Sequence, residues 1–242
     1  MNIVIIGATG GIGSCLSKNL SIDHNLFLGS RQMDKVDSLV DEIKTSNLVS
    51  GYTVDATSFD EIDTFLEKAN DSMGSIDSII NCTGSLILKP AHLTTEDELD
   101  NTFKVNVYSC FGILKYGFKF LKKSGGSVVF FSSAASKVGL KNHETISSAK
   151  GAISSMVVSA ASTYSRYNIR VNAIAPGLVE TPLTEKIIQN KMSLDYSLSL
   201  HGLKRVGKPE NFVPIVSSLI DKRSDWITGQ TICVDGGLSN IK

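Results

Sequence analysis

Short apolar runs alternate with longer amphipathic stretches along the whole chain. The apolar runs predict strands over residues 2–6, 25–29, 49–54, 76–81, 127–131, 169–174 and 231–234. Apolar residues recur with helical spacing near residues 11–21, 33–44, 58–70, 95–123, 144–167 and 209–221. This alternation predicts an α/β fold in which a doubly wound, parallel seven-stranded sheet has helices on both faces.

The predicted strands are continuous apolar runs rather than alternating ones, as expected for strands that are covered on both faces. The 242 residues contain no repeat and no linker, so we expect one domain over residues 1–242. The least regular stretch, residues 177–208, follows the carboxyl end of a predicted strand. Ligands bind at that edge of an open sheet, so we expect this stretch to be a substrate lid.

Charge and hydropathy exclude several classes of partner. Lysine plus arginine and aspartate plus glutamate number 24 each, so the chain lacks the basic field that nucleic acid or anionic lipid would need. No apolar run approaches the roughly 20 residues that span a bilayer, and the five-residue run at the start is too short for a signal peptide. We expect a cytoplasmic protein with a small-molecule substrate and with neither a nucleic-acid nor a membrane partner.

Four cysteines, Cys15, Cys82, Cys110 and Cys233, are scattered along the chain. No cysteine or histidine pair has the spacing of a structural zinc site, so we expect no metal. Free thiols in a reducing compartment are the simplest interpretation.

A glycine-rich loop follows the first predicted strand and precedes a predicted helix. Gly7 permits the tight turn, Gly11 lets the backbone approach a pyrophosphate, and Gly13 allows the helix to pack on the sheet. The free N–H groups at the start of that helix then face the phosphates. This context indicates a dinucleotide site of the Rossmann type.

The Gly-x3-Gly-x-Gly spacing of this loop resembles the short-chain dehydrogenase/reductase family, and the resemblance covers nearly the whole chain. It rests further on the segments Asn81–Gly84, Asn106, Ser132–Ser133, Asn172–Gly177, Thr228–Gln230 and Val234–Gly237. The resemblance implies a nicotinamide cofactor that is contacted by Gly7, Thr9, Gly10, Gly11, Ile12, Gly13, Ser30, Arg31, Asp55, Ala56, Asn81, Cys82, Thr83, Gly84, Lys150, Pro176, Gly177, Val179 and Thr181.

The end of the second predicted strand bears on which dinucleotide is bound. NAD enzymes usually carry an acidic residue here for the ribose 2′-hydroxyl, whereas this strand ends in Ser30 and Arg31. A guanidinium pairs with a 2′-phosphate, so we expect NADP(H). The alternative is NAD(H), with Arg31 a solvated surface residue.

Members of this family reduce carbonyls with a serine, a tyrosine and a lysine, the last two spaced Tyr-x3-Lys on one helix. Lys150 matches the lysine and Ser133 the serine, but Ile146 stands where the tyrosine is expected. Ser133 lies thirteen residues before Ile146, which is the family spacing, so the register is correct and the tyrosine is missing. Isoleucine cannot donate a proton, and the ordinary mechanism does not carry over intact.

Two kinds of family member dispense with that tyrosine. Enoyl-thioester reductases use Tyr-x6-Lys, and dienoyl-thioester reductases lack the Tyr-x3-Lys tyrosine, keep the lysine, and reduce a conjugated C=C. Here His143 stands seven residues before Lys150, so residues 143, 146 and 150 share one helix face. An imidazole there can act as a general acid, with Glu144 orienting it. The alternative is that His143 faces solvent in the loop before the helix. Thr145 and Ser147 carry hydroxyls that could serve as the acid instead, but each is rotated about 100° off this face.

The expected catalytic set is therefore Ser133, Lys150, Asn106 and His143. By resemblance, Lys150 binds the cofactor ribose, Ser133 holds a substrate oxygen, and Asn106 kinks its helix and holds a water near the lysine. His24, His92 and His201 are given no role, and Arg205 a structural one.

The chain is thus expected to be an NADP(H)-dependent oxidoreductase that transfers hydride to a carbonyl or a conjugated C=C of a small molecule or acyl thioester, with a modified proton donor. The alternative is an inactive NADP(H)-binding sensor or subunit partner, which Ile146 favours. The apolar faces of the helices near 95–123 and 144–167, Phe111 included, are mostly core by pattern. The resemblance implies that these helices pair in a homodimer or homotetramer.

Overall fold

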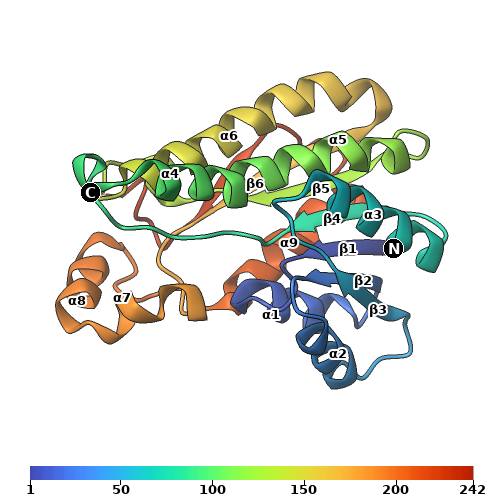
Figure 1. Cartoon of the computed structure of the whole chain (residues 1–242), viewed down its shortest axis with the longest axis horizontal. Helices are drawn as coiled ribbons and strands as arrows, with labels where there is room; N and C mark the ends of the chain where they lie inside the picture. The colour runs from blue at the N-terminus through green and yellow to red at the C-terminus, as the bar shows by residue number, and fades with distance from the viewer. Residues whose placement is uncertain (242) are drawn as a thin grey trace.

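The computed structural model describes residues 1–241 and contains one sheet of seven parallel strands in the order β3-β2-β1-β4-β5-β6-β7. Figure 1 shows this sheet between two layers of helices. The strands are β1 (Asn2–Ile6), β2 (Asn25–Ser30), β3 (Val49–Thr53), β4 (Ser78–Asn81), β5 (Gly126–Phe131), β6 (Ile169–Pro176) and β7 (Thr231–Val234). The predicted doubly wound fold is confirmed.

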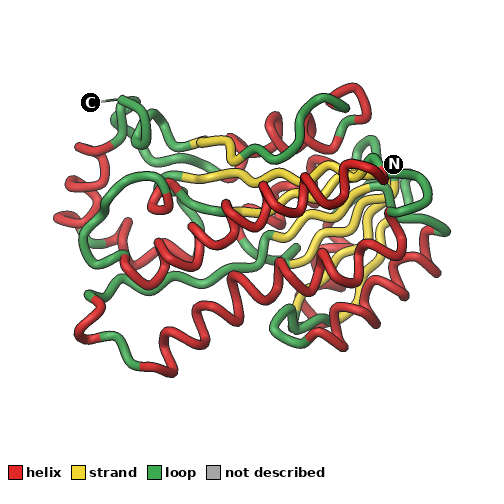
Figure 2. The backbone as a smooth tube through the Cα atoms, turned by 90° about the horizontal axis from the view of Figure 1, so that it is seen from above, coloured by secondary structure: helices red, strands yellow, loops and turns green. Residues whose placement is uncertain are grey.

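Each face of the sheet has its own apolar core. Val4 and Ile6 of β1 pack toward helices α3 (Phe59–Met73), α5 (Ser109–Leu121) and α6 (Glu144–Tyr164). Ile3 and Ile5 of the same strand pack toward α1 (Gly11–Leu20), α2 (Met33–Glu42) and α9 (Val213–Ile220). Successive side chains point to opposite faces, so a strand covered on both sides must be apolar throughout. Figure 2 shows helices on both sides of the strands.

The helix predicted over 95–123 is continuous in space but changes its winding. It consists of α4 (Glu96–Phe103), a π-helical turn (Lys104–Tyr108) and α5. In the π turn, the Asn106 side chain donates to the Thr102 carbonyl at 2.9 Å. A side-chain donor that competes for a helix carbonyl loosens the regular ladder, and π turns of this kind occur often at functional sites.

The stretch 177–208 is more regular than its sequence suggests. It contains a 3-10 turn (Pro182–Thr184), α7 (Glu185–Gln189) and α8 (Lys191–Leu200), with Asn190 capping α8 through a 3.0 Å bond from the Ser193 amide. The expectation of an irregular stretch was wrong here. Neither helix contains a fully buried residue, so neither has the wide apolar stripe by which helices are recognised in a sequence.

Two further findings concern the surface. Phe111 on α5 is 54% exposed, whereas Leu114 on the same helix is buried, so the apolar face of this helix is only partly core. Among residues 1–241, no helix is both long enough and apolar enough to cross a membrane.

Candidate active site

The glycine loop joins β1 to α1 in a conformation that only glycine adopts without strain. Gly7 has φ 78°, and a Cβ there would lie 2.7 Å from the Thr83 amide nitrogen. A Cβ on Gly13 would lie 2.2 Å from the Gly7 carbonyl oxygen, so α1 approaches the loop as closely as a backbone can. Gly10 caps α1 without a side-chain hydrogen bond, which leaves the first N–H groups of the helix to a ligand. This cradle fits a pyrophosphate.

The chain returns over this loop after β6. A Cβ on Gly11 would lie 2.7 Å from Thr181 Cγ2, so Thr181 covers the start of α1. Thr181 is held in a short turn, because the Thr184 hydroxyl accepts from the Thr181 amide at 3.2 Å. The predicted contacts at the start of α1 and after β6 are therefore adjacent in space.

The predicted adenosine-side residues lie at the carboxyl ends of β2 and β3. The Thr9 hydroxyl donates to Ser30 Oγ at 2.8 Å, which links the glycine loop to the end of β2. Arg31 follows directly, is exposed, and within residues 1–241 makes neither an ion pair nor a side-chain hydrogen bond. Its guanidinium is thus available to an anion beside the loop.

Asp55 after β3 is partly committed to its own turn. Its Oδ1 accepts from the Thr57 amide at 2.9 Å and from the Thr57 hydroxyl at 2.8 Å. The next residue, Ala56, is buried. Asp55 therefore stabilises the turn, while no intramolecular hydrogen bond engages its second oxygen within the described residues.

At the end of β4, Asn81 holds the segment that passes beside the glycine loop. Its Oδ1 accepts from the Thr83 amide at 3.0 Å, and its amide donates to Ser109 Oγ at 3.1 Å. Burial raises the pKa of the Cys82 thiol to about 12, so this sulfur stays protonated. Gly84 follows, and a Cβ there would lie 3.3 Å from Asn106 Oδ1 and 3.5 Å from Lys150 Nζ.

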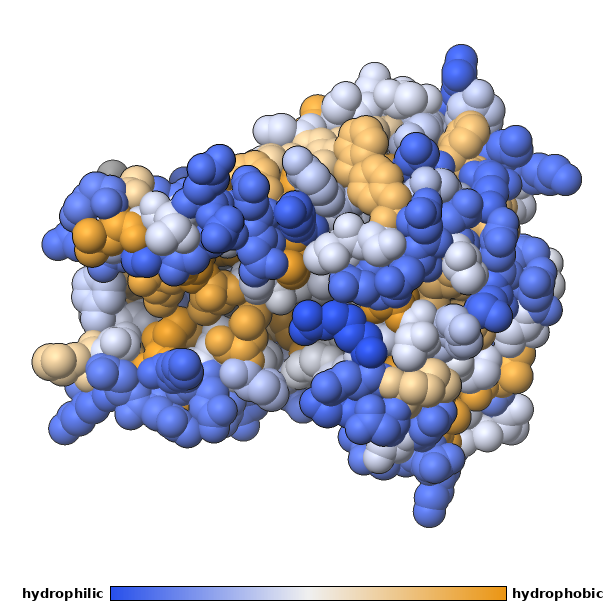
Figure 3. All heavy atoms as spheres, viewed as in Figure 1, coloured by the Kyte–Doolittle hydropathy of each residue, from blue (hydrophilic) through white to orange (hydrophobic). Residues whose placement is uncertain are grey.

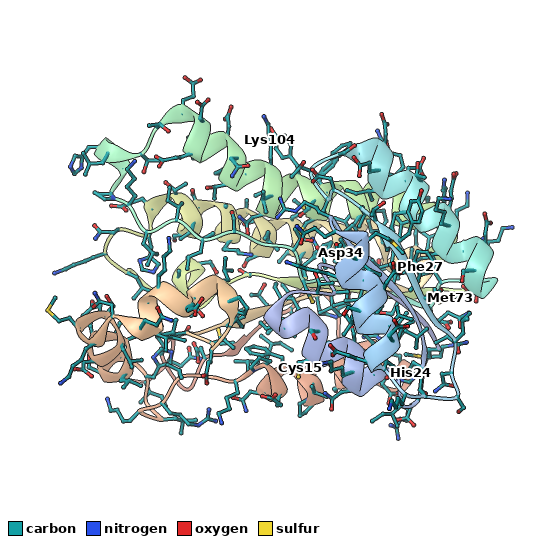
Figure 4. All side chains as sticks on the ribbon, turned by 60° about the horizontal axis from the view of Figure 1, so that its bottom comes forward. Cys15, His24, Phe27, Asp34, Met73 and Lys104 are labelled. Carbon is teal, nitrogen blue, oxygen red and sulfur yellow. The ribbon has the colours of Figure 1, made fainter. Side chains whose placement is uncertain are left out.

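Lys150 on α6 is buried to 8% exposure, and its ammonium donates to the Phe131 carbonyl at 2.8 Å. Burial lowers the pKa of this lysine to about 8. Asn106 in the π turn is fully buried and donates to Ser85 Oγ at 2.9 Å. Gly84 thus separates the ammonium from the Asn106 amide, and the two predicted residues share one neighbourhood. Figure 4 labels Lys104, the first residue of the π turn.

Two neighbouring serines at the end of β5 have different surroundings. Ser132 is buried, and its hydroxyl donates to the Lys150 carbonyl at 2.8 Å, which ties β5 to α6. Ser133 caps a 3-10 turn, with its hydroxyl oxygen accepting from the Ala135 amide at 3.1 Å. Ser133 also lines the adjoining cavity, so its hydroxyl proton remains available to a substrate oxygen.

His143 is the residue before α6 and is half-buried. Its Nδ1 lies 2.7 Å from the Lys141 carbonyl oxygen. A carbonyl only accepts, so Nδ1 carries a proton and Nε2 is the nitrogen free to exchange one. Ser147 donates to the Ala135 carbonyl at 2.6 Å, and the buried Thr145 donates to Thr94 Oγ1 at 3.4 Å.

Of the expected catalytic set, Ser133, His143 and Lys150 line one cavity of about 490 Å³, and Asn106 does not line it. His143, Ile146 and Lys150 all line it, but His143 stands before the first residue of α6, so only Ile146 and Lys150 lie on the helix itself. The stretch expected to be a lid lines the other side with apolar residues from the 3-10 turn, α7 and α8, including Leu183, Ile187 and Leu200. Figure 3 shows hydrophobic atoms in the hollow between α4 and the α7–α8 segment.

Several residues of this cavity were given no role from the sequence, and one of them is a buried histidine. His201 was given no role, yet it is 2% exposed, and both of its ring nitrogens have hydrogen-bond partners. No motif marks it, because its partners are backbone groups of distant or neighbouring residues. Arg205 donates to the Val206 carbonyl and to Asn211 Oδ1, which supports the loop before α9.

Comparison with known proteins gives one consistent picture. Residues 7–239 match the profile of a family described as enoyl-(acyl carrier protein) reductase. A chloroplastic tropinone reductase homolog of Arabidopsis thaliana is 31% identical over 99% of this chain and 76% of its own length. The 3-oxoacyl-[acyl-carrier-protein] reductase of Thermotoga maritima is 31% identical over 97% and 96% of the two chains. Among solved structures, an ElxO variant with NADPH bound superposes with a TM-score of 0.90 at 25% identity, over 98% of each chain.

Proposed function

Because the chain belongs to the short-chain dehydrogenase/reductase family, we propose that it is an NADP(H)-dependent reductase of an unsaturated or carbonyl compound in which His143 supplies the proton. The observation that carries the proposal is that His143, Ser133 and Lys150 line the same cavity beside the glycine loop. Relatives that reduce oxoacyl or enoyl groups on a carrier protein support an acyl thioester as the substrate class.

The glycine loop and the carboxyl end of β2 would hold the dinucleotide. The free N–H groups at the start of α1 bind the pyrophosphate, and Arg31 binds the 2′-phosphate of the adenosine half. Lys150 binds the ribose hydroxyls through the ammonium that now donates to the Phe131 carbonyl. When bound, the reduced nicotinamide supplies a hydride to an electrophilic carbon of the substrate.

Besides binding the cofactor, the site must stabilise the negative charge that develops on the substrate and must deliver one proton. Ser133 donates a hydrogen bond to the substrate oxygen on which the charge develops. His143, protonated at both nitrogens, gives the Nε2 proton to the substrate and stays bonded to the Lys141 carbonyl through Nδ1. The imidazole then regains its proton from water, so two electrons and two hydrogens are accounted for.

Ile146 favours a conjugated C=C over an isolated ketone. Reduction of a ketone leaves an alkoxide on the carbon that received the hydride, and that oxygen needs an acid close by. Ile146 is 3% exposed and presents only an apolar side chain to the cavity beside Lys150. In conjugate reduction, the charge is delocalised onto an oxygen two bonds further along, where another acid can reach it.

NADPH oxidation with crotonyl-CoA and with a panel of ketones tests the proposal. We expect turnover of the enoyl thioester, slow or no turnover of ketones, and a loss of 10²-fold or more in kcat for His143→Gln. Ile146→Tyr should raise ketone reduction, since Ser133, Lys150 and Asn106 are all in place. His92→Gln, at an exposed histidine outside the cavity, is the matched control.

A second candidate function is NADP(H) binding without turnover, for which the buried Ile146 is the specific observation. Tight NADPH binding with no oxidation on either panel, and no gain from Ile146→Tyr, would replace the first function by this one.

A further inference from the structure

His201 follows the last residue of α8, at the point where the lid rejoins the body of the protein. It is the most deeply buried of the four histidines, at 2% exposure. A buried imidazole at the end of an otherwise exposed helix requires an explanation, because no residue of α8 itself is fully buried.

The two ring nitrogens of His201 connect two separate segments. Nε2 accepts from the Leu178 amide at 3.1 Å, so this nitrogen carries no proton. Nδ1 lies 2.7 Å from the Ser197 carbonyl oxygen and therefore donates to it. The hydrogen bonds fix one neutral tautomer, and they join the turn after β6 to the last turn of α8.

The ring is also tightly enclosed. A Cβ on Gly177 would lie 2.6 Å from Nε2, and one on Gly236 would lie 3.6 Å from Cδ2. The imidazole thus fills the space between the turn after β6 and the turn after β7. The absence of a side chain at Gly177 is what lets the ring approach the backbone of Leu178.

His201 also stands between two cavities. It lines the cavity of about 490 Å³ that holds Lys150 and His143, and it lines a second one of about 290 Å³ bordered by Arg205 and Asp235. Gly177 and Leu178 line both cavities as well. The histidine and its hydrogen-bonded turn therefore form the wall between them.

We propose that His201 is a positioning residue that fixes the lid helix α8 to the turn Gly177–Leu178 and so sets the shape of the substrate cavity. The lid contributes Tyr196, Ser197 and Leu200 to that cavity from the turn of α8 that His201 holds. Without the two ring bonds, this turn would keep the His201 amide bond to Ser197 and the Lys204 ammonium bond to the Ser199 carbonyl, but it would lose its link to the turn after β6. We therefore expect substrate affinity to fall before the chemical step is affected.

Hydrogen exchange of the free protein tests this proposal without a substrate. In His201→Phe, which keeps an aromatic ring but neither bond, we expect the amides of residues 194–200 to exchange at least tenfold faster, while those of α6 are unchanged. His201→Gln, whose amide both donates and accepts, should restore most of the protection. His92→Phe, on the exposed turn Ala91–Leu93, is the control.

The kinetic consequence rests on the proposed function and is measured separately. With crotonyl-CoA as the probe, His201→Phe should raise KM at least fivefold with kcat within twofold, and His201→Gln should recover the KM. Failure of the wild type to turn over any probe would contradict the reductase, but the exchange result would still stand.

Exchange rates of residues 194–200 within twofold of wild type in His201→Phe would overturn the proposal. If that variant does not fold, His201→Asn replaces it, because its shorter side chain cannot span both partners and predicts the same faster exchange. Unchanged exchange in His201→Asn would equally overturn it.

Discussion

Lys150 is the residue at which burial and charge conflict most directly. It carries its ammonium into a cavity wall at 8% exposure, with the Phe131 carbonyl as its hydrogen-bond acceptor. Burial lowers its pKa from 10.5 to about 8, so the folded protein disfavours the charged form that a ribose hydroxyl would stabilise. Such a perturbed group at a cavity is typical of functional sites.

Burial of the charged Lys150 is expected to lower the free energy of unfolding by an amount that depends on pH. Below pH 8 the lysine is charged in both the folded and the unfolded chain, and the cost is fully present. Between pH 8 and 10.5 the folded chain releases its proton first, so the unfolded chain binds more protons and stability rises with pH. The span from 10.5 to about 8 corresponds to about 3 kcal/mol.

Denaturant unfolding of Lys150→Met and wild type from pH 7.5 to 10 measures this cost. The unfolding free energy of the variant minus that of wild type should fall across this range, by up to about 3 kcal/mol. Lys123→Met, at an exposed lysine, corrects for the loss of one positive charge. A difference that stays constant or grows with pH would show that Lys150 is not destabilised by burial.

At the scale of elements, strands and helices could be predicted from the sequence wherever burial imposes a pattern of apolar residues. All seven strands and the six longer helical stretches appear close to their expected bounds, because two-sided burial makes strands apolar and one-sided burial gives helices a stripe. Helices α7 and α8 were missed because both are exposed on every face to some degree.

The candidate site, too, could be predicted only where its residues follow a pattern in the sequence. Ile146 and Lys150 could be grouped from their spacing because both lie on α6, whereas His143 lines the same cavity from the position just before the helix. The role of His201 could not be inferred, because its partner Leu178 lies 23 residues away and contributes only a backbone amide. Asn106 was expected to kink its helix, and the structure has a π turn at that position.

The contact between the glycine loop and α1 gives a prediction at this scale. Gly13→Ala would put a Cβ 2.2 Å from the Gly7 carbonyl, so α1 must move, at a cost of about 2 kcal/mol or more. Gly151→Ala on α6 meets nothing within 4 Å and should stabilise by about 0.8 kcal/mol through helix propensity. Chemical denaturation of both variants measures the contrast, and equal effects would refute the close packing of α1.

At the scale of the whole molecule, two neighbouring helices present large apolar side chains to the surface. Tyr108, Phe111 and Val158 are 49%, 54% and 58% exposed on the π turn, α5 and α6. Exposed aromatic residues on adjacent elements are typical of association surfaces. We therefore expect the chain to form a dimer or tetramer through these helices.

Sedimentation velocity of wild type and Phe111→Glu tests the assembly. The wild type should sediment as a dimer or tetramer, and the variant as a smaller species with its unfolding free energy changed by no more than about 0.5 kcal/mol per chain. Ile22→Glu, which replaces an exposed apolar residue before β2, should leave the assembly unchanged. A monomeric wild type, or an assembly that survives Phe111→Glu, would contradict this surface.

The central claim is that a backbone cradle at the start of α1 and a guanidinium at the end of β2 together bind NADP(H). Equilibrium titration of the protein with NADPH and with NADH, for wild type and Arg31→Ala, tests it most directly. We predict that wild type binds NADPH at least tenfold more tightly than NADH, and that Arg31→Ala removes most of this difference, since a charge-assisted bond contributes about 1.5–3 kcal/mol. Binding of neither nucleotide at millimolar concentration would contradict the account.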